Sequence, residues 1–149
     1  MRLLLVLRTV CIASLLIAPV MHAQQPTPSV TSSDTLLAPC PGTPNCVSTE
    51  ATRESQRVPT VPFTDAPEAA LARAKAALLA ESRSKITAER GLHLHGECRS
   101  FLFRFVDDVD IVVDSAARVF RFRSASRVGR SDMGVNRKRI ARIAERLQK

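Results

Sequence analysis

The chain has 149 residues, of which 45% are hydrophobic and 24% charged, which fits one ordinary globular domain with some non-globular sequence and excludes a multidomain protein. It has no Trp, no Tyr and six Phe, so it lacks the aromatic side chains from which platforms for stacking bases or sugars are built. Its formal net charge of +8 favours an anionic partner or a membrane surface.

Residues 1–23 have the pattern of a secretory signal peptide. Arg2 and Arg8 precede an apolar run over residues 10–18, and Met21-His22-Ala23 follows as a small-residue cleavage region, so we expect cleavage after Ala23. The apolar run is about half of the roughly 20 residues that a membrane span needs, which makes an uncleaved anchor the weaker alternative. Cys11 lacks the neighbours of a lipoprotein signal. We therefore expect an exported protein, in the periplasm, the cell envelope or the medium, that is not a lipoprotein and does not bind nucleic acid.

Residues 24–38 are rich in Pro, Ser and Thr and predict a disordered tether, so the folded domain is expected over residues 39–149. Two prolines and a glycine bend the chain between Cys40 and Cys46, and an oxidising compartment favours a disulfide between them. Pairing of Cys98 with either cysteine, or a metal site, is the alternative, although no close Cys–His spacing favours zinc.

Residues 65–81 predict an amphipathic helix that lies on a sheet. Asp65 is placed to cap its N-terminus and Pro67 stands in the first turn. One stripe of the helix is apolar, formed by Leu71, Ala74 and Leu78.

The period changes towards two from Lys85 onward, which predicts strands. The apolar positions Leu92, Leu94, Gly96 and Cys98 alternate with polar ones. Residues 109–114 and 118–123 are rich in β-branched and aromatic side chains, and the short connection between them predicts a hairpin.

Residues 135–149 return to helical spacing. One face carries Ile140, Ile143, Ala144 and Leu147, and the other carries Lys138, Arg142, Arg146 and Lys149. The predicted class is α+β: a small antiparallel sheet with a hairpin, packed by an N-terminal Ala-rich helix and a C-terminal basic amphipathic helix.

Three ordered motifs carry a resemblance to a known family. They are CPGTPNCVS at residues 40–48, FRFVDDV at residues 103–109 and RSASRVGRSDMGVNR at residues 123–137. The chain resembles the bacterial and plastid "domain of unknown function" family numbered 1499 over residues 39–148. The family has no established reaction, so the resemblance implies boundaries and motif positions without a chemistry. The polar and glycine positions within these motifs are Asp107, Asp108, Ser124, Ser126, Gly129, Asp132, Gly134 and Asn136.

Residues 115–149 hold eleven of the 22 basic groups and only two acids. Arginine forks suit carboxylate or phosphate groups, so the candidates for an anion-binding surface are Arg121, Arg123, Arg127, Arg130 and Arg137. In an extended strand the first three share a face, while Phe120, Phe122 and Ser124 point into the core. We favour the alternative that these arginines pair internally with hairpin neighbours, namely Asp107, Asp108, Asp110 and Asp132.

Asp107, Asp108 and Asp110 also resemble an oxygen-ligand cluster for a divalent cation. Neighbouring strand residues point to opposite faces, so Asp107 and Asp108 converge only if the backbone turns or bulges between them. We favour such a turn, with the carboxylates bonding backbone amides, over a metal site. We predict that Asp107 and Asp108 lie near Arg123 and Arg127, in one polar network with the loop that follows.

Two further segments hold candidate ligands. Gly129 and Gly134 permit positive φ around Asp132, a candidate cap for the last helix, whose N-terminus is also a candidate anion site. On the strand face, the candidate metal ligands are His93, His95 and Glu97, although a solvated polar face is the interpretation we favour.

These observations favour a non-catalytic envelope protein with an Arg-rich surface for a small anion, a lipid headgroup or a polysaccharide, and they predict no cofactor. Two alternatives stay open, and so does the oligomeric state. An enzyme would use Asp107 or Asp108 with a metal or with Ser124 or Ser126. An interaction module would lay the basic helix, residues 135–149, on an anionic membrane or a partner protein.

Overall fold

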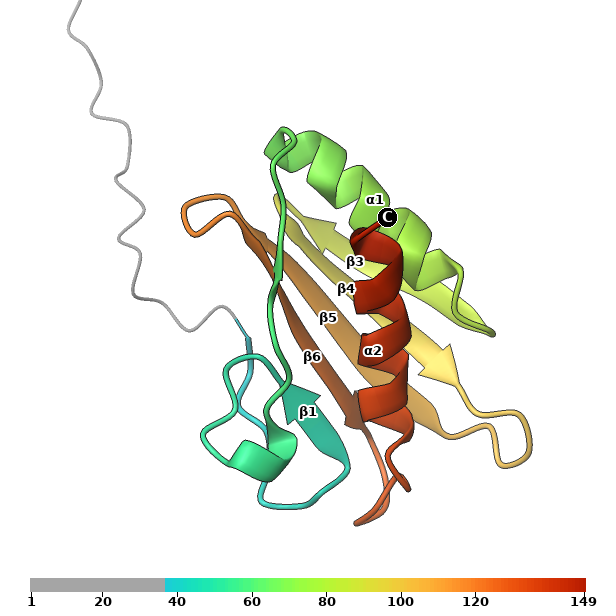
Figure 1. Cartoon of the computed structure of the whole chain (residues 1–149). Helices are drawn as coiled ribbons and strands as arrows, with labels where there is room; N and C mark the ends of the chain where they lie inside the picture. The colour runs from blue at the N-terminus through green and yellow to red at the C-terminus, as the bar shows by residue number, and fades with distance from the viewer. Residues whose placement is uncertain (1–36) are drawn as a thin grey trace, which may run out of the picture. The chain divides into compact units, whose positions relative to one another are not determined.

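The structure is a computed structural model that describes residues 37–149 (Figure 1). The predicted signal peptide and most of the predicted tether lie outside the described residues. Leu37, which the sequence placed in the tether, is buried, and its N–H donates to Glu50 Oε2 at 3.3 Å. Within residues 37–149, neither helix has the length and apolar character needed to span a bilayer.

The described residues form a six-stranded antiparallel sheet and two helices, which confirms the α+β class. In chain order the elements are β1 (Cys46–Ser48), the short 3-10 helix η1 (Glu54–Gln56), β2 (Val61–Pro62), α1 (Pro67–Leu79), β3 (Ser84–Arg90), β4 (His93–Arg99), β5 (Val106–Asp114), β6 (Val119–Ser126) and α2 (Val135–Leu147). The sheet order is β1-β6-β5-β4-β3, and β2 pairs with the other end of the same edge of β6. The hairpin predicted from the sequence is β5–β6.

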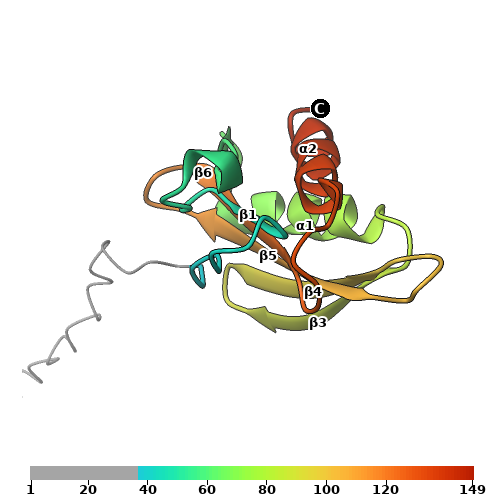
Figure 2. The ribbon, with the colours of Figure 1, turned by 90° about the horizontal axis from the view of Figure 1, so that it is seen from below.

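Both helices pack on one face of the sheet (Figure 2). Alternate residues of the long strands point into this layer and form the core with the apolar stripes of α1 and α2; the central side chains are Leu78, Leu94, Val109, Ile111, Phe120, Phe122, Ile140 and Ile143. The opposite face of the sheet therefore carries the polar residues of each alternating strand. No described helix covers that face.

Helix α1 starts without the predicted cap. The Asp65 carboxylate accepts hydrogen bonds from Arg73 Nε at 3.0 Å and Nη2 at 2.8 Å, so it holds a side chain of the helix and leaves the first-turn amides free. The helix ends at Leu79, two residues earlier than predicted. Glu81 follows it and is buried, and its carboxylate pairs with Arg142 and Arg146 of α2. This ion-pair cluster ties the end of α1 to α2.

Gly96 lets α1 approach β4. A Cβ at this position would lie 2.8 Å from Leu78 Cδ2 and 2.8 Å from the carbonyl oxygen of Lys85. Both distances are shorter than van der Waals contact, so the helix could not pack at its observed depth over a larger residue.

The predicted disulfide between Cys40 and Cys46 is confirmed. It precedes β1 and holds the segment that pairs with β6, because Cys46 opposes Ala125 in the sheet. Cys98 is a free thiol buried in the core, and burial raises its pKa. The alternative pairing of Cys98 with Cys40 or Cys46 was therefore wrong.

Candidate functional site

The uncovered face of the sheet carries an ion-pair network in which the predicted arginines meet carboxylates. Arg127 Nη2 lies 2.7 Å from Asp108 Oδ1 and 2.8 Å from Glu97 Oε1, and Arg127 Nε donates to both oxygens of Asp108 at 3.1 Å. Lys85 Nζ lies 3.0 Å from Glu97 Oε2. The pairing of Asp108 with Arg127 is the one we predicted. It engages the Arg127 guanidinium at this end of the uncovered face.

The middle of the same face is organised around Asp110. Its Oδ1 lies 3.2 Å from His93 Nε2 and 2.8 Å from His95 Nδ1, and its Oδ2 lies 3.5 Å from Arg123 Nη1. The Asp110 side chain is only 12% exposed, so one carboxylate orients two imidazoles and one guanidinium. The two histidines do not converge with Glu97, which turns to Lys85 and Arg127.

The remaining candidate arginines are also engaged or lie elsewhere. Arg121 pairs with Asp114 at 2.8 Å and with Glu50 at 3.6 Å. Arg137 donates to two backbone carbonyl oxygens, of Arg57 at 2.9 Å and Ser55 at 2.6 Å. Arg123 and Arg127 thus pair internally with two of the acids that we predicted. Arg121 also pairs internally, but with acids that the prediction did not include, so the row is not a free anion clamp.

The predicted turn between Asp107 and Asp108 was wrong, because β5 runs straight through both residues. Asp107 points to the helical face instead, where its Oδ2 lies 2.6 Å from Arg139 Nη2 of α2. Both side chains are almost completely buried. Asp107 therefore does not join Arg123 and Arg127, and it does not form a carboxylate cluster with Asp108 and Asp110.

Asn136 is the centre of a second buried polar network. Its Oδ1 accepts from Ser124 Oγ at 2.6 Å and from the Arg139 guanidinium, while its Nδ2 donates to the Asn45 carbonyl oxygen and to Ser126 Oγ, both at 3.0 Å. Of the residues of the family motifs, Ser124, Ser126 and Asn136 thus meet here. The network joins β6, α2 and the disulfide segment.

The loop between β6 and α2 is held by its own polar groups. Asp132 accepts from the N–H groups of Gly134 at 3.0 Å and Asn136 at 2.7 Å, which satisfies amides at the start of α2. Gly129 and Gly134 adopt positive φ, and the Gly129 carbonyl oxygen accepts from Asn45 Nδ2 at 2.6 Å. Because Asp132 occupies these amides, the helix N-terminus is not an open anion site.

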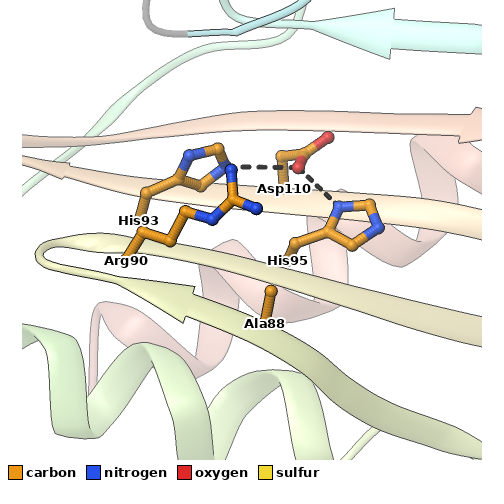
Figure 3. A pocket seen from close by; sticks show the side chains of 5 residues that line it. All are labelled: Ala88, Arg90, His93, His95 and Asp110. Atoms are coloured by element: carbon orange, nitrogen blue, oxygen red, sulfur yellow. Dashed lines mark hydrogen bonds and ion pairs between the residues drawn. The ribbon is translucent and has the colours of Figure 1, made fainter.

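A shallow pocket of about 310 Å³ lies beside Asp110 (Figure 3). It is lined by Ala88, Arg90, His93, His95 and Asp110. Figure 3 shows the Arg90 side chain reaching towards the space between the two imidazole rings. The small Ala88, directly opposite His95, leaves the hollow open.

A bulge at Thr87 decides which residues of β3 line this pocket. Ile86 opposes Gly96, but Ala88 opposes His95, so one extra residue is inserted. An unbroken register would place Thr87 and Glu89 on the histidine face. The bulge puts Ala88 and Arg90 there instead and sends Glu89 to the helical side, where it lies 2.7 Å from Lys75 Nζ of α1. Arg90 therefore lines the pocket at the place where an unbroken register would put Glu89.

Arg90 is the cation that the sequence analysis missed. In residues 37–149 no carboxylate lies within ion-pair distance of it, whereas Arg121, Arg123 and Arg127 each have at least one. Charge alone could not single it out among 22 basic residues. The signal that could have identified Arg90 is the pairing of β3 with β4, the strand that carries His93 and His95. The bulge changes the register of this pairing, and the sequence does not reveal the change. Within the described part of the chain, no group of three or more His, Cys, Asp or Glu side chains is arranged to hold a metal ion.

Glu97 makes part of the stability dependent on pH. Hydrogen bonds from Lys85 and Arg127 lower its pKa from 4.5 to about 2. A carboxylate with a lowered folded-state pKa stabilises the fold above its unfolded pKa, and this contribution is lost as the pH falls from about 4.5 through about 2. We expect the urea midpoint to fall with pH across this window, and the slope to be shallower in Glu97→Gln than in the parent.

The matched control for this pH profile is Glu68→Gln, at an exposed position of α1 that forms no ion pair within residues 37–149. Its profile should follow that of the parent protein. If Glu97→Gln and Glu68→Gln lose stability with the same slope, the lowered pKa of Glu97 is not coupled to folding.

Comparison with known proteins identifies a family. A sequence model of the family described as "Protein of unknown function (DUF1499)" matches residues 36–147. The chain therefore belongs to this family, which confirms the resemblance seen in the three motifs. No curated protein and no solved structure matches the chain.

Proposed function

We propose that this member of the DUF1499 family is an exported, non-catalytic binding protein of the cell envelope, and that its sheet pocket holds a small anionic molecule. One observation carries the proposal: Arg90 lines the pocket beside two imidazoles and has no carboxylate partner in residues 37–149. The other arginines on this face are already paired. Export is supported by the pattern of residues 1–23.

The pocket chemistry favours a carboxylate or phosphate group. A guanidinium presents a planar fork that matches either group. Three of the four imidazole nitrogens face the carboxylates of Asp108 or Asp110, so His93 Nδ1 is the one left to donate to a ligand. Asp110 holds His93 and His95 in place, so the rings are oriented before a ligand arrives. A volume of about 310 Å³ suits a small molecule and not a polymer segment buried along its length.

The geometry gives less support to the enzyme alternative. Asp107 and Asp108 lie on opposite faces of β5, and the buried Asp107 carboxylate is paired with Arg139. Ser124 Oγ is buried and donates to Asn136 Oδ1, so no carboxylate is positioned to activate it. A binding role is the function that these contacts favour.

The alternative in which α2 lies on a membrane is also less favoured. Its apolar residues Ile140, Ile143 and Leu147 are buried against the sheet and α1. Two of its arginines, Arg142 and Arg146, pair with Glu81. The apolar face is thus not available to a bilayer.

The pocket can be tested through its histidines. The chain has three His, and only His93 and His95 lie in the described domain, so their imidazole NMR signals report directly on the pocket. Titration with inorganic phosphate and with succinate should shift both signals. A ligand at one hundred times its Kd should also stabilise the fold by about 2.7 kcal/mol.

Arg90→Gln should abolish both effects. Arg99→Gln is the matched control, because it removes an equal charge from an exposed position on the next strand, and it should leave the titration intact. Unmoved histidine signals with both anions, or equal losses in the two variants, would refute the anion pocket.

A further inference from the structure

The loop that joins β4 to β5, residues 100–105, turns large apolar side chains towards solvent. The exposed fractions are 79% for Phe101, 74% for Leu102, 68% for Phe103 and 51% for Phe105. Three of the six Phe of the chain lie in this loop, whereas the other three are buried. Concentrated apolar exposure of this kind marks a contact surface.

Two hydrogen bonds between its first and last residues, Ser100 and Phe105, close the base of this loop. The Ser100 N–H donates to the Phe105 carbonyl oxygen at 2.9 Å, and the Phe105 N–H donates to Ser100 Oγ at 2.9 Å. The rings of Phe103 and Phe105 stack with their centroids 5.5 Å apart. The exposed side chains therefore share one structured tip.

A second loop with exposed apolar residues, residues 127–134, lies at the same end of the sheet. The Arg127 N–H donates at 3.1 Å to the carbonyl oxygen of Val106, where β5 begins, so the bases of the two loops are adjacent. Met133 is 89% exposed. Figure 1 shows both loops beyond the ends of the strands, at the end of the domain opposite the β5–β6 turn. We call residues 100–105 and 127–135 together the apolar end.

The apolar end holds nearly all the exposed large hydrophobic side chains of the described domain. Residues 37–149 expose eight of them, and seven belong to the apolar end: Phe101, Leu102, Phe103, Phe105, Val128, Met133 and Val135. A soluble surface normally scatters such residues singly. Their collection at one end indicates a partner that contacts this end of the domain.

The charges of the apolar end are cationic. Its one acid, Asp132, uses its two carboxylate oxygens on amides at the start of α2. Arg104 and Arg130 form no ion pair with any residue of the described domain. The Arg83 guanidinium lies 5.4 Å from the centre of the Phe101 ring, at the flank of the loop. The partner therefore offers an apolar layer next to negative charge.

We propose that the apolar end docks on the surface of a lipid bilayer that contains anionic lipids. The Phe and Leu side chains enter the boundary between headgroups and acyl chains, and Arg104 and Arg130 bind the headgroup phosphates. A bilayer supplies both features over an open surface, which matches two loops that project beyond the ends of the strands (Figure 1). This site is separate from the pocket at Arg90.

A single tryptophan can report on this docking, because the chain has no Trp of its own. The full chain carrying Phe103→Trp is mixed with vesicles of phosphatidylcholine and phosphatidylglycerol, some with bromine-labelled acyl chains. We expect a blue shift of the Trp emission and quenching by the bromine. Leu102→Trp is a second reporter, should Phe103→Trp fold poorly.

The matched control is Ala116→Trp, in the exposed β5–β6 turn at the other end of the sheet. Contact between vesicles and residues outside the described domain would affect both proteins, but only a Trp that enters the bilayer is quenched. Ala116→Trp should therefore keep its emission and resist quenching.

The charge requirement is tested separately. Arg104→Gln and Arg130→Gln should each weaken binding to the mixed vesicles by about fivefold, because one basic residue near an anionic surface contributes about that factor. Lys149→Gln removes the same charge at the far end of α2 and should leave binding unchanged. Vesicles of phosphatidylcholine alone should bind all variants more weakly.

Two results would overturn the proposal. The first is equal emission and equal quenching of Phe103→Trp and Ala116→Trp with the mixed vesicles. The second is a blue shift of Phe103→Trp without lipid that grows with protein concentration, which would assign the apolar end to a second copy of the chain.

Discussion

Replacing Arg139 with methionine should lower the free energy of unfolding by about 3–5 kcal/mol, which is the typical loss when one partner of a buried ion pair is removed. The guanidinium lies 2.6 Å from Asp107 Oδ2, and the side chains of Arg139 and Asp107 are 7% and 8% exposed. Arg139 also donates to Ser124 Oγ at 3.0 Å. Its loss leaves the Asp107 charge buried under α2 without its ion-pair partner. Urea denaturation at neutral pH measures the effect.

Two further variants separate the buried charge from lost packing. Adding Asp107→Asn to Arg139→Met removes the stranded charge at nearly constant volume, so the double variant should be more stable than Arg139→Met alone. Arg127→Ala breaks a pair on the uncovered face, where the Arg127 side chain is 44% exposed, and should cost only a small fraction of the loss in Arg139→Met. Equal losses in Arg127→Ala and Arg139→Met would contradict the burial argument.

Asn136→Ala should lower the free energy of unfolding by about 2–4 kcal/mol, because each buried polar group left without a partner costs about 1–3 kcal/mol. The Asn136 side chain is completely buried and bonds Ser124, Ser126, Asn45 and Arg139. Without its amide, the Asn45 carbonyl oxygen loses its bond from Asn136 and the Ser124 hydroxyl loses its acceptor. The urea midpoint gives the loss.

Lys138→Ala is the control for Asn136→Ala on the same helix. It makes the same change to alanine at an exposed position that has no ion pair within residues 37–149, so it reports the effect of helix propensity alone. Its stability should stay near that of the parent. A loss in Asn136→Ala no greater than in Lys138→Ala would show that the network does not hold α2 on the sheet.

The hydrogen bonds of Asn136 and Asp132 explain why polar residues of the third family motif gather at one place. Ser124, Ser126 and Asn136 are used in joining β6 to α2, and Asp132 in starting α2. These contacts hold β6, the loop after it and α2 together. The surfaces that we propose for partners are the pocket at Arg90 and the apolar end, part of which belongs to the same motif.

Local pattern was sufficient to predict both helices, the longer strands and several contacts. Alternation along β4 and β6 determines which residues are buried, because strand side chains alternate between faces. The prolines and glycine between Cys40 and Cys46 indicated the disulfide. The pairing of Asp108 with Arg127 followed from hairpin neighbours of opposite charge. β1 and β2 were missed, since three and two residues are too few to show a period.

Only the tertiary structure decided the sites. By the alternation of β5 alone, Asp107 and Asp108 had to face opposite ways, but the partner of Asp107 became visible only when α2 placed Arg139 over it. The bulge at Thr87 put Arg90 in place of Glu89 beside the histidines, and no local pattern marks it. In the regular strands β4 and β6 the sequence by itself determined which side chains share a face, because side chains alternate along an unbroken strand. Which faces meet depends on register and helix packing, and these are set by contacts between residues far apart in the chain.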